Sequence, residues 1–563
     1  MKGKDKLKIR DISKNPDTSL VTITGESLMP LPYPCNDMVQ PGTGKLTEDQ
    51  KKRFEHGLDG IVAVAIPKPK SKAEEEMLVG RFLMGLRKLF SKEHNWTFLQ
   101  PLLLSMEYCV KCQTCSDACP IYEASGRKEI YRPTYRSEVL RRLYKRYVNG
   151  ENKLLSWLSG DDIELNWATI ARLAESAYRC TLCRRCAQTC PIGIDNGLIA
   201  HEIRKLMSQE LGIAPKELHE KGTVQQLEVG SSTGLKPDGL MNIIDFMEEE
   251  IQEKTGRKVK IPVDKKGADI LLIHNAGEFL SWPENPAAFA VLFEEAGLKW
   301  TLSSELCGYD AVNYGVWYDD AQLARIAYRH AKVAKELNVS KIVVGECGHA
   351  HKALIVVADR ILLGDLNIPR VSCMPILEEI VFSGMLKLDP QKNNFPITLH
   401  DPCNMVRLLG IVEPQRRILR AIAPQFREMA QHGTENYCCG GGSGFAIMSP
   451  MNLIDWKLGV SGRMKVKQVL DAFQPNMRQG NTKFVCAPCS NCKGQFRDLI
   501  QYYELEKRAN IHYTGLVELI VNAMVDTPMS YISEAAIEEV AAVHTPVEAP
   551  VPRSGGEMNH SRG

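Results

Sequence analysis

Two short segments of the chain carry four cysteines each, at the same spacing. Both segments, "YCVKCQTCSDACPIYE" and "RCTLCRRCAQTCPIGID", read C-x2-C-x2-C-x3-C-P. Their cysteines are Cys109, Cys112, Cys115 and Cys119 in the first and Cys180, Cys183, Cys186 and Cys190 in the second. This spacing turns three thiolates around one corner of a cubane, and the proline redirects the chain after the fourth cysteine. The two segments therefore predict two [4Fe-4S] clusters.

The ligands of these clusters are expected to cross between the segments. In proteins with two such clusters, the fourth cysteine of each run binds the other cluster. We therefore expect cluster 1 on Cys109, Cys112, Cys115 and Cys190, and cluster 2 on Cys180, Cys183, Cys186 and Cys119. A pair of zinc sites is the alternative, but zinc ribbons use paired C-x2-C knuckles separated by a longer loop.

A third cysteine-rich segment, "NYCCGGGSGF" at residues 436–445, places Cys438 and Cys439 side by side. A disulfide between them would be strained, because neighbouring Cα atoms lie only about 3.8 Å apart. The glycines match neither common phosphate-loop pattern, and a single zinc ion is awkward for two side chains that point apart. A cluster with several irons accepts both thiolates on different metals, and the glycines let backbone N–H groups approach its sulfides.

Composition limits the other functions that the chain could have. Its 563 residues suffice for two to four domains, and 70 basic against 68 acidic residues make nucleic acid an unexpected partner. No apolar run is long enough to span a bilayer, and no apolar segment follows the charged N-terminus. We therefore expect a soluble intracellular protein, whose 18 cysteines are ligands or redox groups rather than disulfides.

The elements that must position these cysteines fall into two kinds. Helical periodicity between the first two runs predicts a helical ferredoxin-type domain with a long insert. Its basic side chains are expected on a solvated helix face: Arg136, Arg141, Arg142, Lys145 and Arg146. Residues 74–90 form an amphipathic segment that we expect to pack on the core.

The rest of the chain reads as two similar α/β halves. One half begins with a strand near residue 268 and the other with a strand near residue 395, and the same order of strands and helices follows in both. This repeat predicts a duplication with small parallel sheets. The cysteines follow the strand ends, where open α/β sheets bind ligands. The second half carries most of them: Cys403, Cys438, Cys439, Cys486, Cys489 and Cys492. In the first half we expect Cys307 and Cys373 to be small buried hydrophobes, while Cys347, beside His349 and His351, is left open.

The order of these motifs carries a family resemblance over roughly residues 100–525. Cys403, the Cys438–Cys439–Gly440 motif and Cys486-x2-Cys489 resemble the cysteine-rich CCG domain of heterodisulfide reductases. The resemblance implies a special, non-cubane [4Fe-4S] site on Cys403, Cys438, Cys439, Cys486 and Cys489, where a disulfide or trisulfide is cleaved. Cys492 is an extra thiol that could replace one of these ligands. His400, His432 and His512 are candidate proton donors, since histidine titrates near neutral pH.

The resemblance also implies a setting. It is that of a catalytic iron–sulfur subunit on the cytoplasmic face of the inner membrane, in a Dsr-type complex with a cytochrome b subunit linked to menaquinol. The implied substrate is a small DsrC-like sulfur-carrier protein. The alternative is a relay subunit of a flavin-linked 2-hydroxy acid or glycerol-3-phosphate dehydrogenase.

The predicted fold class is α/β plus α. The expected domains are an N-terminal extension (1–100), a helical ferredoxin-type domain with two clusters (101–225), a linker (226–265), a first, degenerate CCG half (266–390), a second CCG half with the special cluster (391–526), and a largely disordered tail (527–563). Cys35 is expected to be a free thiol.

Overall fold

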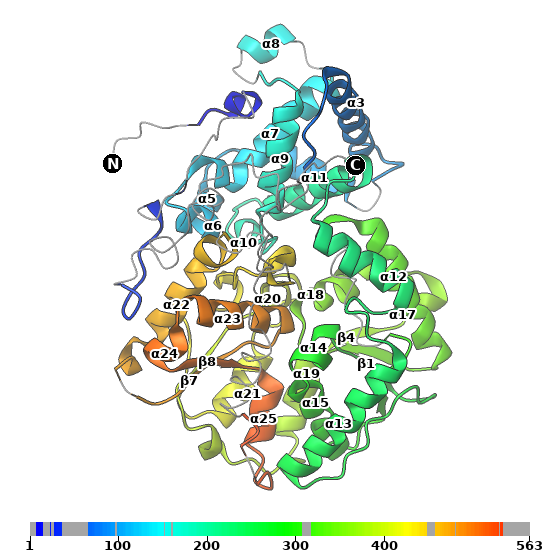
Figure 1. The fold of residues 1–563 in the computed structure, drawn as a ribbon, viewed down its shortest axis with the longest axis vertical. Helices are drawn as coiled ribbons and strands as arrows, with labels where there is room; N and C mark the ends of the chain where they lie inside the picture. Colours follow the sequence, from blue (N-terminus) through cyan, green and yellow to red (C-terminus); the bar gives the residue numbers. More distant parts are fainter. Residues whose placement is uncertain are drawn as a thin grey trace, which may run out of the picture.

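The computed structural model places a helical domain above two α/β halves that lie side by side (Figure 1). It describes residues 7–14, 23, 27–36, 66–95, 98–150, 153–158, 162–306, 317–447, 456–478, 480–528 and 530–532. The predicted position of Cys307 and most of the predicted tail lie outside these residues. Among the described residues, no helix combines the length and the hydrophobicity needed to cross a bilayer.

The helical domain is built around α11 (Asn196–Leu211), which crosses its centre. Its other helices are α3 (Lys72–Leu89), α4 (Leu99–Glu107), α5 (Thr114–Ala118), α6 (Pro120–Ala124), α7 (Pro133–Tyr147), α8 (Lys153–Leu158), α9 (Trp167–Tyr178) and α10 (Arg185–Gln188), with short 3-10 turns at η1 (Ile9–Ser13) and η3 (Glu129–Tyr131). Helix α3 begins at Ser71, whose hydroxyl accepts the Glu74 N–H at 3.2 Å. Its apolar face is buried at Leu78, Phe82, Leu86 and Leu89, so this segment packs on the core as predicted.

The first half contains a four-stranded parallel sheet in the order β2-β1-β3-β4. The strands are β1 (Ile270–Ile273), β2 (Trp300–Thr301), β3 (Lys341–Val344) and β4 (Arg370–Ser372). The helices are α14 (Ala276–Ser281), α15 (Glu284–Glu295), α17 (Asp320–Glu336), α18 (Gly348–Ala350) and α19 (Cys373–Phe382), with the short turns η5 (His351–Val357), η6 (Ala358–Arg360), η7 (Gly364–Leu366) and η8 (Pro390–Asn393) near its end. Cys373 is fully buried among apolar side chains, as expected.

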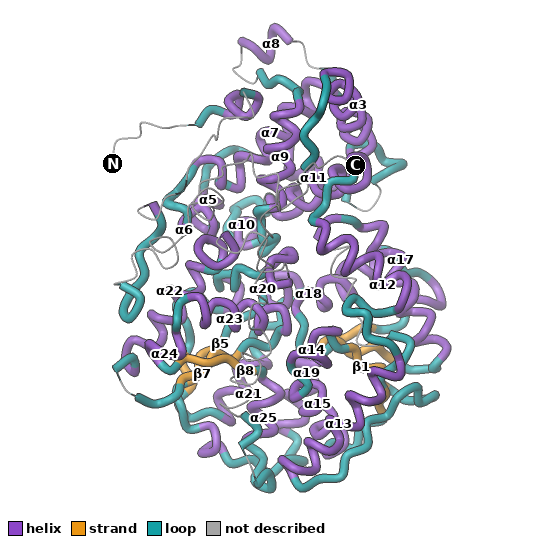
Figure 2. The backbone as a smooth tube through the Cα atoms, viewed as in Figure 1, coloured by secondary structure: helices purple, strands orange, loops and turns teal. Residues whose placement is uncertain are grey.

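The second half repeats this order in a separate parallel sheet, β6-β5-β7-β8 (Figure 2). Its strands are β5 (Ile397–Leu399), β6 (Phe426–Arg427), β7 (Lys483–Cys486) and β8 (Ile511–Thr514). Its helices are α20 (Cys403–Leu408), α21 (Pro414–Ile422), α22 (Arg463–Phe473), α23 (Ser490–Tyr502), α24 (Leu505–Ala509) and α25 (Leu516–Asn522), and its shorter turns are η9 (Gly433–Glu435), η10 (Gly442–Ile447), η11 (Trp456–Ser461) and η12 (Gln474–Asn476). The equal strand order fits the predicted repeat, although a duplication stays a prediction.

The segment expected as a linker is largely helical. It contains α13 (Pro237–Thr255), which follows η4 (Glu217–Val224) and α12 (Gln225–Val229). Helix α13 buries Leu240, Ile244, Met247 and Ile251 in the same apolar core as α15. The chain between the helical domain and the first sheet is therefore part of the α/β region rather than an open connection.

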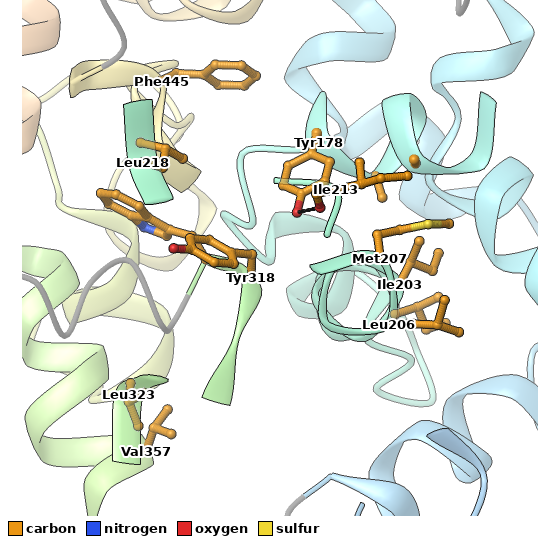
Figure 3. Close-up of a cluster of buried hydrophobic side chains, with 14 of the residues drawn as sticks. Tyr178, Ile203, Leu206, Met207, Ile213, Leu218, Tyr318, Leu323, Val357 and Phe445 are labelled. Atoms are coloured by element: carbon orange, nitrogen blue, oxygen red, sulfur yellow. Dashed lines mark hydrogen bonds between the residues drawn. The ribbon is translucent and has the colours of Figure 1, made fainter. Parts of the chain in front are cut away.

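One hydrophobic cluster joins the three parts of the molecule. Figure 3 shows Tyr178 and Ile213 of the helical region, Leu323 of the first half and Phe445 of the second half within this cluster. The Tyr178 hydroxyl donates to the Ile213 carbonyl at 2.9 Å, which satisfies its buried oxygen. This shared core fixes the helical domain against both halves, and it therefore fixes the distances between their cysteines.

Candidate iron–sulfur centres

The two cysteine runs of the helical domain have the same unusual backbone. Lys111 and Gln113 flank Cys112 with φ values of 57° and 70°, and Leu182 and Arg184 flank Cys183 with φ values of 52° and 59°. Residues other than glycine rarely adopt positive φ, and such positions gather at functional sites. Each loop then enters a short helix, α5 or α10, that carries the third cysteine. The same left-handed turns recur in each run, which fits one [4Fe-4S] cluster at each.

The structure brings cysteines of the two runs close to one another, and the crossed assignment of ligands stays a prediction. Burial raises the pKa of Cys115 to about 12, and the neighbouring Cys109, Cys119, Cys190 and Cys112 add to the shift. The pKa of Cys119 is also raised, by burial and by Cys183 and Cys180 of the other run. The fourth cysteine of each run thus lies against the opposite set. Cys112 is exposed while Cys183 and Cys186 are buried, so the first group faces the surface and the second faces the protein interior.

Arg136 does not lie on a solvated helix face, contrary to the expectation from the sequence. Its side chain is 5% exposed, and Nη2 donates to Cys180 Sγ at 3.3 Å. Arg141 and Arg142 instead pair with Glu138 on α7. A guanidinium is favoured beside a thiolate because it supplies charge-assisted hydrogen bonds. Arg136 therefore belongs to the surroundings of the second cluster.

Six buried or half-buried sulfurs of the α/β region form one series of contacts. The Cys439 and Cys492 Sγ atoms lie 3.5 Å apart. Hydrogen bonds between thiols link Cys403 to Cys438, Cys438 to Cys439, Cys492 to Cys489 and Cys489 to Cys347. Hydrogen bonds from Cys438 and Cys492 hold the pKa of Cys439 well below its ordinary value. His400 joins Cys439 and Cys492 in a group whose ligand atoms lie within 4.8 Å of one another, which suits a metal.

The glycines of the CCG segment permit close backbone approaches. A Cβ on Gly440, where φ is 94°, would lie 2.5 Å from Gly462 Cα, and a Cβ on Gly442 would lie 2.5 Å from the Thr181 carbonyl oxygen. The Gly440 and Gly441 N–H groups donate to the Sγ atoms of the cysteines two residues earlier, both at 3.4 Å. The segment can therefore press its two thiols against the second cysteine run and supply N–H donors to them.

Cys183 connects the second cubane position to this group. Its thiol hydrogen-bonds to Cys438 and shifts the pKa of both side chains. Arg407, on α20, donates to the Cys183 carbonyl at 2.7 Å and to the Thr434 carbonyl at 2.8 Å. This arginine ties the cysteine run of the helical domain to the loop that precedes Cys438. The two metal positions are neighbours, with a thiol from each in contact.

The structure does not bring Cys486 to the sulfur series. Cys486 ends β7 fully buried in an apolar core with Leu399 and Leu516, while its neighbour Val485 faces the cysteines. Burial raises its pKa, and the groups that modify this shift are carboxylates and a lysine rather than other thiols. Cys492, the extra thiol of the sequence, lies beside Cys439 instead. Cys35 is a buried free thiol, as expected.

The sequence left open whether the first half, through Cys347, His349 and His351, tunes a nearby site, and the structure places two of its residues at Cys489. The Gly348 N–H donates to Cys489 Sγ at 3.2 Å, and His349 forms a further hydrogen bond to the same thiol. Asn491 Nδ2 lies 2.8 Å from His349 Nδ1 and holds the ring. The "GECGHAH" segment was a visible signal, but the partner of its histidine could not be read from the sequence.

The three histidines named as proton donors lie in different surroundings. His400 is buried with Nε2 3.3 Å from Cys492 Sγ, and burial lowers its pKa well below the ordinary value. His512 Nε2 contacts Asn510 Oδ1 at 2.6 Å on β8, and His432 is exposed. Only His400 touches the sulfur series. Lys465 lies near it too, and burial lowers its pKa to about 7.

Comparisons with known proteins agree with this arrangement. Residues 105–194 match the family described as 4Fe-4S dicluster domain, and residues 397–497 match the cysteine-rich domain family named CCG. No solved structure was found that matches the chain.

Similar proteins share most of the chain. The Hdr-like menaquinol oxidoreductase iron-sulfur subunit 2 of Archaeoglobus fulgidus is 28% identical over 496 residues, which cover 79% of this chain and 83% of that protein. One component of the dihydromethanophenazine:CoB–CoM heterodisulfide reductase of Methanosarcina acetivorans is 24% identical over 437 residues, 76% of this chain and 96% of that protein. The EtfAB:quinone oxidoreductase of Syntrophomonas wolfei is 23% identical over 447 residues, 75% of this chain and 58% of that protein.

These findings define the class of the protein. It is an iron–sulfur oxidoreductase that joins a helical two-cluster domain to a mixed α/β region with a CCG domain, and its cofactors are [4Fe-4S] clusters. More narrowly, it is a CCG-domain protein of the heterodisulfide reductase-like type.

Proposed function

We propose that the chain is the catalytic iron–sulfur subunit of a respiratory complex and reduces a disulfide or trisulfide at its CCG site. The observation that carries this proposal is the unbroken series of sulfur contacts from Cys183, in the second cysteine run, through Cys438 and Cys439 to Cys492. A separate electron carrier would need no such cluster of thiols beyond its second cubane. A site that binds and splits sulfur compounds does need it.

We assign the ligands by position. Cys109, Cys112, Cys115 and Cys190 would hold the first cubane, and Cys180, Cys183, Cys186 and Cys119 the second. The special cluster would be held by Cys403, Cys438, Cys439, Cys489 and Cys492, with Cys492 in place of Cys486. The donor set fits an iron–sulfur group, because thiolates are its usual ligands and the site collects them with few competing oxygens.

When bound, such clusters supply single electrons and iron atoms that can bind sulfur. The residues of the chain prepare the site for that chemistry. Gly348 and Gly441 direct N–H groups at Cys489 and Cys439, and Arg136 donates to Cys180, so each stabilises the deprotonated form of a ligand. His400 places Nε2 beside Cys492, where a proton on that nitrogen can be shared with sulfur. Cys438 and Cys439 are only 1% and 3% exposed, so the site excludes bulk water.

The partners belong to the same proposal. The names of the relatives include a menaquinol oxidoreductase and a heterodisulfide reductase, which supports a quinol-linked donor such as a membrane cytochrome b subunit. We place the chain with the K subunits of Dsr-type complexes, on the cytoplasmic face of the inner membrane, with a DsrC-like carrier as substrate. The exposed first cluster group is the expected entry point for electrons.

The test is EPR spectroscopy of the purified holoprotein with and without a trisulfide or disulfide substrate. We expect a paramagnetic signal that depends on substrate in the wild type and is absent in Cys439→Ser, while both cubane signals persist. A signal that is the same in the variant would overturn the assignment of the site.

A relay function is the second candidate, and one relative favours it by name. The EtfAB:quinone oxidoreductase is named for quinone rather than for a sulfur compound, and it shares 75% of this chain. In that case the chain would pass electrons from a flavoprotein without cleaving sulfur bonds. Reduced protein mixed with an organic disulfide separates the two: a reductase releases thiol, whereas a relay leaves the disulfide intact.

A further inference from the structure

An apolar cavity of about 540 Å³ lies where the helical domain meets the two α/β halves, and the electron path described above does not use it. Its walls come from α4, from the second cysteine run and the start of α11, and from η5 and α17 of the first half. Its apolar lining includes Leu104, Leu182, Leu198, Leu323, Val356 and Leu408. A volume of this size, at a boundary between domains, is typical of a pocket for a small organic group.

Two residues that line the cavity are close along the chain to proposed cluster ligands. Leu182 directly precedes Cys183, and Leu408 ends the helix that begins with Cys403. At a rise of about 1.5 Å per residue, Leu408 lies about 7.5 Å along the axis from Cys403. Cys403 is also half-buried, whereas Cys438 and Cys439 are covered. A ligand in the cavity therefore approaches the special cluster from the side of Cys403.

Most charged groups of the cavity are neutralised by protein partners. Arg184 Nε lies 2.6 Å from Asp195 Oδ2, and Asp320 Oδ2 lies 3.4 Å from the Lys205 ammonium. The guanidinium of Arg360 stacks over the ring of Phe98 with 5.3 Å to its centroid. Arg360 keeps its positive charge, but its side chain is exposed to water.

Lys352 is different, because its ammonium makes no hydrogen bond or ion pair with the residues that the structure describes. It lines the cavity and lies close enough to Cys403 for a charge on that sulfur to act on it. Burial lowers its pKa to about 8, with Arg184 adding to the shift. A half-buried cation without a partner is costly, and a ligand anion would remove that cost. Among the described residues that line the cavity, Lys352 is therefore the half-buried cation that lacks a counter-ion.

We propose that this cavity is the substrate pocket and that it takes thiols or disulfides with an apolar body and a carboxylate a few bonds from the sulfur. This proposal rests on the proposed function and names its substrate class. The carboxylate pairs with Lys352, the sulfur points towards the Cys403 side of the special cluster, and the apolar body lies between α4 and η5. Lys352 lies on η5, which packs against the helix α20 that carries Cys403, so we expect the acid and the sulfur of the ligand to lie close together.

Binding without turnover tests the pocket. The probes are 2-mercapto-3-phenylpropanoate and its neutral amide, and their affinities for the anaerobic holoprotein are measured by equilibrium dialysis. We expect the acid to bind at least tenfold more tightly than the amide to the wild type. Lys352→Met should remove this preference, because it keeps the length of the side chain and removes the charge. Val356→Trp should weaken both probes at least tenfold, because it fills the cavity.

Lys216→Met is the matched control, since Lys216 is an exposed lysine outside the cavity and should leave both affinities unchanged. Iron content and the cubane EPR signals establish that each variant is folded. Equal binding of acid and amide to the wild type, or a preference that survives in Lys352→Met, would overturn the pocket. Preferred binding of the acid without thiol release from its disulfide would leave the pocket standing and refute the reductase function instead.

Discussion

Replacing Cys492 and Cys486 separately by alanine distinguishes the ligand set of the structure from that of the sequence motif. Both thiols are buried, with exposed fractions of 4% and 0%. Only Cys492 lies in the sulfur series, 3.5 Å from Cys439. The two changes remove the same atom from equally dry surroundings, so a difference in metal content reports on ligation rather than on packing.

Three [4Fe-4S] clusters correspond to about twelve irons per chain. We expect Cys492→Ala to lose about four of them, because a special cluster with one thiolate missing is released or degraded. Cys486→Ala should keep all of them. Its cost is the loss of one buried sulfur from an apolar core, about 1 to 2 kcal/mol in the free energy of unfolding.

The assay is iron and sulfide analysis of anaerobically purified protein, with thermal unfolding measured in parallel. The reasoning fails if Cys486→Ala loses the irons while Cys492→Ala keeps them, since the motif order would then outweigh the observed contacts. It also fails if both variants keep the full content. Loss of the two cubane EPR signals in either variant would show a general folding defect and would require the milder Cys→Ser change.

Two further predictions concern the packing around the site. Burial raises the pKa of Glu346 to about 8 from an ordinary value of 4.5. The stability that its bound proton provides is therefore complete below about pH 4 and is lost as pH rises to about 8, by at most about 1.4 kcal/mol per pH unit. In Glu346→Gln, the midpoint of thermal unfolding should vary less between pH 5 and 8, and an unchanged slope would contradict this. Gly440→Ala should abolish the special cluster, because its Cβ would lie 2.5 Å from Gly462 Cα. Gly256→Ala is the control, since Gly256 also has a positive φ but has open space around it. This control should lower the free energy of unfolding by about 1 kcal/mol and keep all irons, as measured by iron and sulfide analysis.

The sequence predicted those features that depend on local pattern. Short apolar segments bounded by turns marked β1, β3, β5 and β7. The crossed ligand set of the two cysteine runs stays a prediction, although the structure places Cys115 near Cys190. Local pattern also identified the CCG glycines as positions of close backbone approach.

The role of Cys486 depended on which face of β7 it occupies. A strand of a parallel sheet is covered on both faces, so "FVC" within β7 is apolar throughout and shows no alternation that reveals the direction of the last side chain. Arg136 was misplaced for a related reason: a charged residue on an amphipathic helix is usually exposed, and its partner Cys180 is 44 residues away in sequence. Contacts between distant segments decide both cases.

The half without a CCG set still forms part of the site, which explains why its strand ends have chemistry of their own. A Cβ on Gly348 would lie 3.1 Å from Pro402 Cβ and 3.4 Å from Cys489 Sγ, so glycine lets β3 and β5 present their following loops to the same sulfur. The Glu346 carboxyl group accepts the Leu516 and Val517 N–H groups at the start of α25, at 3.1 and 3.0 Å, and so holds the two halves together. Because the N–H of Gly348 reaches Cys489 only across this joint, any movement between the halves would change the hydrogen bonding of a cluster ligand. Among the residues described, the first half therefore reaches the centre through the Gly348 N–H, His349 and the Cys347 thiol, all of which contact Cys489.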